Sequence, residues 1–284
     1  MKRTLTIGVL LSAAIPAFAQ TQAPPPAKVI QIYREQVKPG KAVAHEKVEV
    51  GWPAAFAKAS SPAYYVAMTS VSGPGEAWYI NPRDSFAALG KDDEAVEKNP
   101  ALKAQLDALS AQDGELLSGI SIYLATYRED LSYRPDIEWS KARLVNVTTF
   151  RINMGRDQDF VAWRKIVNDA HAKANMNESW VVYQVTSGAP GGTFLLFAPL
   201  KSMADLDALA DMHGKSYQDA VGEDNRTRIR DLQHETLQSV SSQVFAMSPK
   251  MSYVSKEFAS GDPDFWTPKP PAPAKVPAKA EAKQ

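Results

Sequence analysis

The sequence contains no cysteine, which excludes disulfides and thiol chemistry, and it contains only four histidines. It also lacks a nucleophile elbow, a His-Glu-x-x-His zinc motif and a phosphate-binding P-loop. Basic and acidic residues number 32 each, so the formal net charge is zero. A balanced charge does not indicate binding to nucleic acid or to an anionic membrane. Function therefore has to be inferred from the organisation of the chain.

The first 19 residues have the pattern of a signal peptide. Lys2 and Arg3 precede a short apolar run at residues 5–14, and Ala17 and Ala19 form a small-x-small cleavage pattern before Gln20. The apolar run is too short to span a bilayer, so no transmembrane span is expected once the signal is removed. The signal pattern predicts a periplasmic or secreted location. Without disulfides, a secreted protein of this size depends on its hydrophobic core for stability.

Two stretches, residues 64–89 and 180–206, share one pattern. Each reads as a strand, a Gly/Pro turn, a second strand, a proline and the start of a helix. The surrounding residues also match, since Gly40 corresponds to Gly155 and Tyr65 corresponds to Trp180. An internal repeat of this length predicts two similar βαββαβ units.

The repeat divides the chain into segments. Helices are expected at residues 41–59, kinked by Pro53, and at residues 224–241, with a closing strand at residues 244–254. We expect an α+β fold in which two ferredoxin-like βαββαβ units pack their bare sheet faces together as a pseudo-dimeric α/β barrel. The predicted segments are a signal peptide (1–19), a flexible lead-in (20–27), the first unit (28–130), a linker (131–142), the second unit (143–258) and a tail rich in Pro, Ala and Lys (259–284).

Residues 32–48, IYREQVKPGKAVAHEKV, carry a family resemblance. A strand, a Pro-Gly turn with flanking lysines and an amphipathic helix resemble the opening of dimeric α/β-barrel proteins of the NIPSNAP-like and antibiotic-biosynthesis-monooxygenase-like groups. The resemblance implies a fused pair of ferredoxin-like units. The superfamily includes cofactor-free oxygenases, haem-binding enzymes and members without known activity, so the fold alone does not select a function.

The first strand of each unit supplies most of the candidate ligand-binding residues. Ile30 and Ile32 match Val145 and Val147, and this apolar face is expected to meet the helices. The alternating polar and aromatic residues then point into the barrel, where they form either a ligand pocket or a hydrogen-bonded structural network. These candidates are Gln31, Tyr33, Glu35, Asn146 and Thr148, joined by Tyr123 from a later strand.

Three histidines are further candidates. His45 and His171 lie near the apolar faces of the first helices of the two units, and His213 lies between two short helices. Each is either a ligand or base in a pocket or a packed or helix-terminal histidine without chemistry. No metal site and no cofactor are predicted. Haem is the alternative that the resemblance raises, although no histidine here matches an axial-ligand motif.

These observations favour a secreted or periplasmic barrel that binds a small, partly apolar molecule. One alternative is a cofactor-free or haem-dependent oxygenase-like enzyme that uses His45, His171 or His213. Another is a structural protein of the cell envelope that uses the lysine-containing tail. The sequence leaves all three open.

Overall fold

The computed structural model describes residues 23–210 and 214–267 of the 284-residue chain. The first half contains four strands and four helices, and the second half repeats this plan with one long first helix. In chain order the elements are β1 (Val29–Val37), α1 (Ala42–Glu49), α2 (Gly51–Lys58), β2 (Val66–Ser70), β3 (Glu76–Arg83), α3 (Phe86–Glu97), α4 (Pro100–Gly114), β4 (Leu117–Tyr127), two 3₁₀ turns (Glu129–Leu131 and Trp139–Lys141), β5 (Leu144–Ile152), α5 (Asp157–Lys173), β6 (Val181–Ser187), β7 (Thr193–Leu200), α6 (Asp205–Ala210), α7 (Lys215–Val221), α8 (Glu223–Thr236), β8 (Leu237–Met247), α9 (Lys256–Ser260) and α10 (Pro263–Trp266).

The eight long strands close into one antiparallel barrel in the order β1-β3-β2-β8-β5-β7-β6-β4. Each half contributes four adjacent strands in the same order, β4-β1-β3-β2 and β8-β5-β7-β6, which is the ferredoxin-like arrangement. The two half-sheets join through β2 with β8 and β4 with β6. The predicted α+β fold of two sheets packed as a barrel is therefore confirmed.

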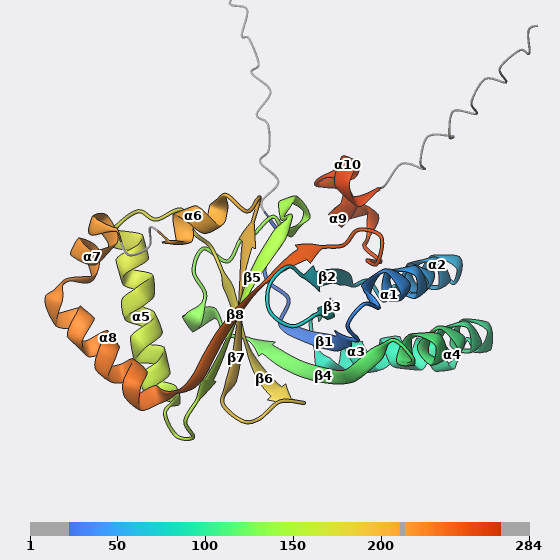
Figure 1. Cartoon of the computed structure of the whole chain (residues 1–284), viewed down its shortest axis with the longest axis horizontal. Helices are drawn as coiled ribbons and strands as arrows, with labels where there is room; N and C mark the ends of the chain where they lie inside the picture. The colour runs from blue at the N-terminus through green and yellow to red at the C-terminus, as the bar shows by residue number, and fades with distance from the viewer. Residues whose placement is uncertain (1–22, 211–213, 268–284) are drawn as a thin grey trace, which may run out of the picture.

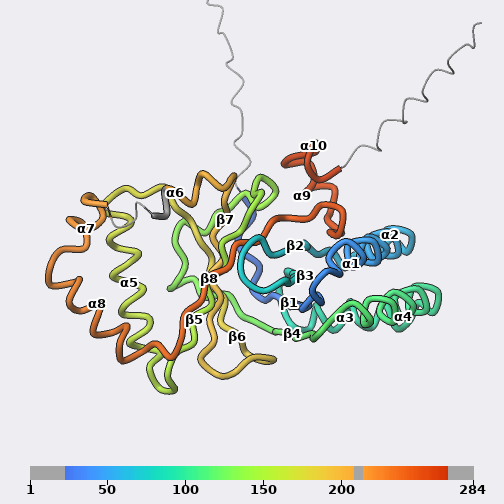
Figure 2. Tube along the Cα trace, in the orientation of Figure 1, coloured from blue at the N-terminus to red at the C-terminus, as the bar shows by residue number. Residues whose placement is uncertain are grey.

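The helices of the two halves cover opposite sides of the barrel (Figure 1). Helices α1 to α4 lie on one side and α5 to α8 on the other, and the tube in Figure 2 shows the strands running between these two layers. Each half therefore has two separate interfaces, one inside the barrel and one between its sheet and its own helices. The candidate site lies in the second kind of interface.

Local sequence sets the turns and helix starts in both halves. Gly40 and Gly155 have φ angles of +76° and +81°, so each supplies the left-handed conformation that ends the first strand of its half. Ser85 accepts a hydrogen bond from the Ala88 amide, and Asn99 accepts one from the Leu102 amide. These side chains cap α3 and α4, as residues of their type do at helix N-termini.

The barrel interior is an apolar core, which corrects the orientation expected from the sequence. Ile30 and Ile32 pack inside the barrel with Val145 and Val147. Gln31, Tyr33 and Glu35 consequently lie on the outer face of the sheet, toward α1 to α3. An eight-stranded barrel is just wide enough to be filled by side chains, and here branched apolar residues fill it. Period-two alternation separates the two faces of a strand but does not say which one closes the barrel.

The C-terminal part of the second half also differs from expectation. The helix predicted at residues 224–241 ends at Thr236, and β8 runs from Leu237 to Met247 where a strand was expected only from residue 244. Short helices α9 and α10 then follow, where the sequence predicts a tail from residue 259. Trp266 is buried there and donates a hydrogen bond from Nε1 to the Ser140 carbonyl.

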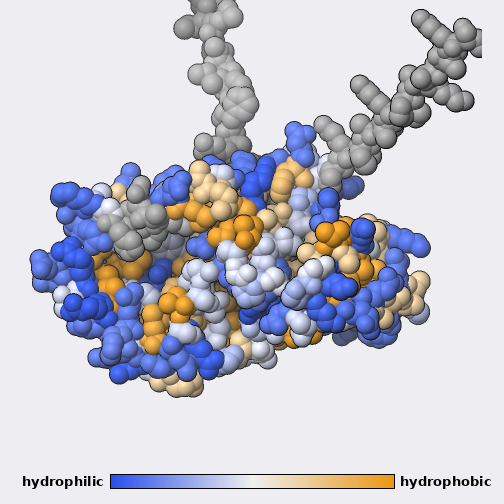
Figure 3. Space-filling model, viewed as in Figure 1, coloured by the Kyte–Doolittle hydropathy of each residue, from blue (hydrophilic) through white to orange (hydrophobic). Residues whose placement is uncertain are grey.

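On the face shown in Figure 3, the surface is mainly hydrophilic and is interrupted by several smaller hydrophobic areas. Within residues 23–210 and 214–267, no helix has the length and apolar character that a membrane span requires.

Candidate functional site

A cavity of about 200 Å³ lies between the outer face of the first half-sheet and its helices. Its floor is formed by side chains of β1 and β3, and its walls come from α1, α2 and α3. Aromatic and aliphatic side chains form one part of the lining, and carboxyl, amide and phenol groups form the other. The lining residues are Gln31, Tyr33, Glu35, Glu49, Trp52, Phe56, Ala63, Tyr65, Tyr79, Asn81, Arg83, Leu89, Asp92, Asp93 and Val96.

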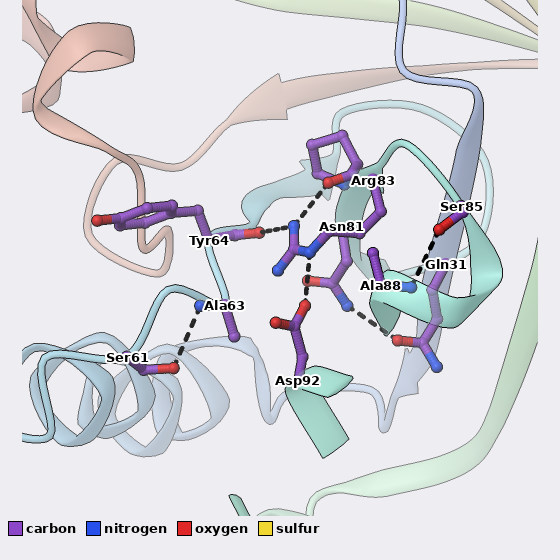
Figure 4. Close-up of polar contacts among 10 residues, drawn as sticks. Gln31, Ser61, Ala63, Tyr64, Asn81, Arg83, Ser85, Ala88 and Asp92 are labelled. Atoms are coloured by element: carbon purple, nitrogen blue, oxygen red, sulfur yellow. Dashed lines mark hydrogen bonds and ion pairs between the residues drawn. The ribbon is translucent and has the colours of Figure 1, made fainter. Parts of the chain in front are cut away.

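One end of the cavity is bordered by a set of polar contacts around Arg83 (Figure 4). The Arg83 guanidinium donates to the Asp92 carboxylate on α3 and to the backbone carbonyl of Tyr64, 3.1 Å away. Beside it, the Asn81 amide donates to Gln31 Oε1 at 3.3 Å. These bonds tie β3 to α3 and to the segment before β2, so this end of the cavity has a fixed shape.

A buried cluster of acidic groups around one histidine lies at the inner wall of the cavity. His45 Nε2 on α1 is 2.9 Å from Glu35 Oε2 on β1 and 3.5 Å from Asp113 Oδ1 near the end of α4. Glu49, one helical turn after His45, completes the group. One potential ligand atom from each of the four residues lies within 4.8 Å of the others. All four side chains are buried.

Burial has a strong electrostatic effect on this cluster. Desolvation raises the pKa of Glu35 to about 7, and desolvation together with the charge of Glu35 raises the pKa of Glu49 to about 8. The same two causes raise the pKa of Asp113 to about 6. Carboxyl groups with pKa values near neutrality exchange protons readily at physiological pH, and such groups cluster at functional sites.

Tyr123 lies inside the barrel and not at this cavity. Its hydroxyl accepts a hydrogen bond from Arg34 Nη1 at 2.7 Å. Arg34 also donates to both carboxylate oxygens of Glu76, at 3.1 and 3.0 Å, and Trp78 Nε1 donates to Glu76 Oε2 at 2.6 Å. Apart from Arg34 Nε, which has no hydrogen-bond partner among the described residues, the polar atoms named here are paired, as in a structural element of the barrel.

None of the predicted residues of the second half that the structure describes lines the cavity. Asn146 and Thr148 lie on the outer face of β5, and Thr148 Oγ1 is 2.8 Å from Ser242 Oγ. His171 lies on the buried face of α5. Its Nδ1 donates a hydrogen bond to the Val167 carbonyl at 2.8 Å, and its ring packs on Trp180. Burial lowers the pKa of His171. His171 therefore has the features of a packed core histidine, and His213 lies outside the described residues.

Sequence reasoning found Glu35 and His45 but missed Glu49 and Asp113. Glu49 follows His45 by four residues, the spacing that places two side chains on one helix face, and this signal was available. Asp113 is far away in sequence and reaches the cluster only because α4 packs on α1 and α2. No spacing of residues along the sequence predicts a contact between Asp113 and His45.

Haem does not fit the described residues. An axial histidine must face a space that accepts the macrocycle. His45 Nε2 is engaged by two carboxylates, His171 is enclosed by aromatic rings, and His234 is exposed on α8. The cavity of about 200 Å³ is also smaller than the roughly 300–1,000 Å³ of sites for drug-sized ligands.

The chain resembles solved structures in fold but no characterised sequence. No protein-family model and no curated protein matches it. A putative monooxygenase from Fusobacterium nucleatum aligns with a TM-score of 0.51 and 14% identity, over 78% of this chain and 93% of the other. An anthrone oxidase-like protein aligns with a TM-score of 0.51 and 12% identity, over 81% and 95%. A putative chlorite dismutase aligns at a TM-score of only 0.46 and 11% identity, over 79% and 96%. The alignments at 0.51 show that this chain has the fold of the monooxygenase-like α/β barrels.

Proposed function

We propose that the protein binds a small, partly apolar molecule in the cavity of its first half. The observation that carries this proposal is the position of the carboxylate–histidine cluster on the wall of a cavity that also has an aromatic lining. A cavity of about 200 Å³ suits a molecule with a single ring, since one of about 150 Å³ accommodates benzene. Pockets that combine an apolar lining with a few convergent polar groups are typical of small-molecule sites.

The polar end of the ligand is a hydrogen-bond donor or carries positive charge. Glu35 and Glu49 present carboxyl groups to the cavity, and a bound ammonium group would favour their ionised, accepting form. The one basic side chain of the lining, Arg83, is engaged by Asp92. A carboxylate on the ligand would be repelled by the acidic groups of the cavity wall. This reasoning excludes simple organic anions as the preferred ligands.

Filling the cavity tests this proposal. Val96 is half-buried and lines the cavity, so Val96→Trp places an indole in the space that the ligand needs. The common aromatic probe 8-anilinonaphthalene-1-sulfonate is too bulky for this cavity. Phenol and benzylamine, each with one ring, are the probes, and calorimetry measures their binding. Benzylamine is expected to bind the unchanged protein, and at least about 10-fold more weakly after Val96→Trp, because losing the burial of an apolar group of this size costs about 1.5–3 kcal/mol.

The matched control is Val43→Trp, the same exchange at an exposed position of α1 outside the cavity. It should leave benzylamine binding unchanged. Equal binding by both variants, or no binding of any single-ring amine or phenol to the unchanged protein, would contradict the proposal.

A second candidate function is an oxygenase-like reaction on an aromatic substrate. The 2.9 Å contact between His45 and Glu35 favours it, because Glu35 lines the cavity and can pass a proton from a bound phenol to the buried His45. Oxygen consumption with phenolic substrates, measured for the protein and for His45→Gln, tests it; equal rates would exclude His45 as the base. Secretion or a periplasmic location, the NIPSNAP-like relationship and an envelope role for the tail remain proposals that rest on the sequence.

A further inference from the structure

The four side chains of the buried cluster have the spacing of metal ligands. Two neighbouring ligands of an octahedral ion, each about 2.1 Å from it, lie about 3 Å apart. His45 Nε2 is 2.9 Å from Glu35 Oε2 and 3.5 Å from Asp113 Oδ1, and the full set with Glu49 spans 4.8 Å. Small movements of these side chains would place one ion among them.

The cluster has more negative groups than the protein balances. Among the described residues, His45 is the only ion-pair partner of Glu35 and Asp113, and Glu49 forms no ion pair. Three carboxyl groups buried around one imidazole are costly unless they are protonated or bound to a cation. A divalent ion would supply the missing positive charge.

Unpartnered polar atoms beside the cluster point to the same conclusion. Tyr79 is 7% exposed, and its hydroxyl lies next to Glu35 and Glu49. Within the described part of the chain, Glu49 Oε1 has no hydrogen bond of good geometry, and the Tyr79 hydroxyl lies close to both carboxyl groups without a well-aligned bond to either. Buried polar atoms without partners are rare and commonly mark a missing ion or water. A metal ion would bind the Glu49 oxygen, and a water on the ion would reach the Tyr79 hydroxyl.

The second half shows that the fold does not require this cluster. The strand registers match Glu35 with Phe150, and the equivalent first helices match His45 with Phe160. The rings of Phe150 and Phe160 pack 5.4 Å apart in an aromatic core. Arg164, the counterpart of Glu49, is also buried there and stacks over Phe150. The same place in the fold is thus filled by aromatic rings and one arginine in the second half, and by three carboxyl groups and a histidine in the first.

We propose that Glu35, His45, Glu49 and Asp113 bind one divalent first-row transition-metal ion, such as Mn²⁺, Fe²⁺, Co²⁺ or Zn²⁺. A mixture of imidazole and carboxylate donors suits these ions, while the absence of thiolates disfavours softer ones. Glu35 and Glu49 also line the cavity, so the open side of the ion faces the space proposed for the ligand. The metal site stands on its own geometry and does not depend on the identity of that ligand.

Titration of the metal-stripped full chain with Co²⁺ tests the assignment. Calorimetry should show one tight equivalent per chain, and the visible absorption of Co²⁺ should shift from that of the aqueous ion. Glu49→Gln and Asp113→Asn each remove one donor while keeping side-chain size. Each should weaken Co²⁺ binding at least about 100-fold, since even an indirect partner of a metal ligand contributes about 10- to 100-fold.

The controls are Asp169→Asn, the same exchange at an exposed residue of α5, and His234→Gln on the surface of α8. Both should bind Co²⁺ as the unchanged protein does, and circular dichroism should show all four variants folded. The assignment is wrong if Co²⁺ does not bind, or if Glu49→Gln and Asp113→Asn bind it as tightly as the controls. Binding of benzylamine is measured in the same samples as a separate readout. If benzylamine binds and Co²⁺ does not, only the metal site is refuted.

Discussion

Replacing the buried Glu49 by glutamine should stabilise the metal-free protein, and the gain should grow with pH. Burial raises the pKa of Glu49 from 4.5 to about 8 in the folded state. Below pH 4.5 the carboxyl group is protonated in both the folded and the unfolded chain and contributes nothing. Above pH 4.5 the unfolded chain releases the proton while the folded chain keeps it, so the free energy of unfolding falls.

The magnitude follows from the size of this shift. Each pH unit between the two pKa values costs about 1.4 kcal/mol, so the loss is about 3 kcal/mol at pH 7 and about 4 kcal/mol at pH 8. Glutamine carries no proton to release, so Glu49→Gln should escape this loss.

Urea denaturation at pH 4.5, 6 and 8, with EDTA present throughout, measures the effect. Glu49→Gln and the unchanged protein should unfold with similar free energies at pH 4.5, and the variant should be the more stable by several kcal/mol at pH 8. Glu46→Gln, on the exposed side of the same helix, is the matched control and should show no such divergence. Parallel pH profiles for Glu49→Gln and the unchanged protein would refute the description of Glu49 as a buried, unbalanced carboxyl group.

Two further predictions concern groups outside the cavity. Glu76→Gln should cost about 3 kcal/mol in urea denaturation, because it leaves Arg34 without its carboxylate partner inside the barrel; a loss under 1 kcal/mol would show that this pair is not a structural unit. His171→Phe should make stability less sensitive to acid. Burial lowers the pKa of His171, so this residue supports the fold above pH 6.5 and the support is lost as pH falls, whereas phenylalanine does not titrate. Urea midpoints that fall equally between pH 7.5 and pH 5 with and without the exchange would contradict this account.

Much of the architecture could be predicted from the sequence because the two halves of the chain repeat one pattern of strands, turns and helices. Glycines at the same turn, such as Gly40 and Gly155, and matched strand pairs require no tertiary information, and they predicted two units of one plan. The start of β8 was missed for a local reason. Residues 237–243 are mostly polar and exposed, and their two apolar members, Leu237 and Val240, are three residues apart. This spacing continues the apolar pattern of the preceding helix and so predicts a longer helix.

The candidate site was only partly predictable because it depends on which sheet face the helices cover. Both faces of β1 are suitable for burial, with Ile30 and Ile32 on one and Tyr33 and Glu35 on the other. Closure of the barrel with the second half decides between them, and this is a property of the whole sheet. Asp113 joins the cluster through helix packing across a long sequence separation, which no local pattern encodes.

A crystal structure of the full chain soaked with Mn²⁺ and benzylamine, with anomalous scattering data, tests the central claim most directly. The account predicts one anomalous peak among Glu35, His45, Glu49 and Asp113, with density for the aromatic amine in the adjoining cavity and nothing at the matching place beneath α5. A cavity closed by its own side chains, with no peak at the cluster, would contradict it.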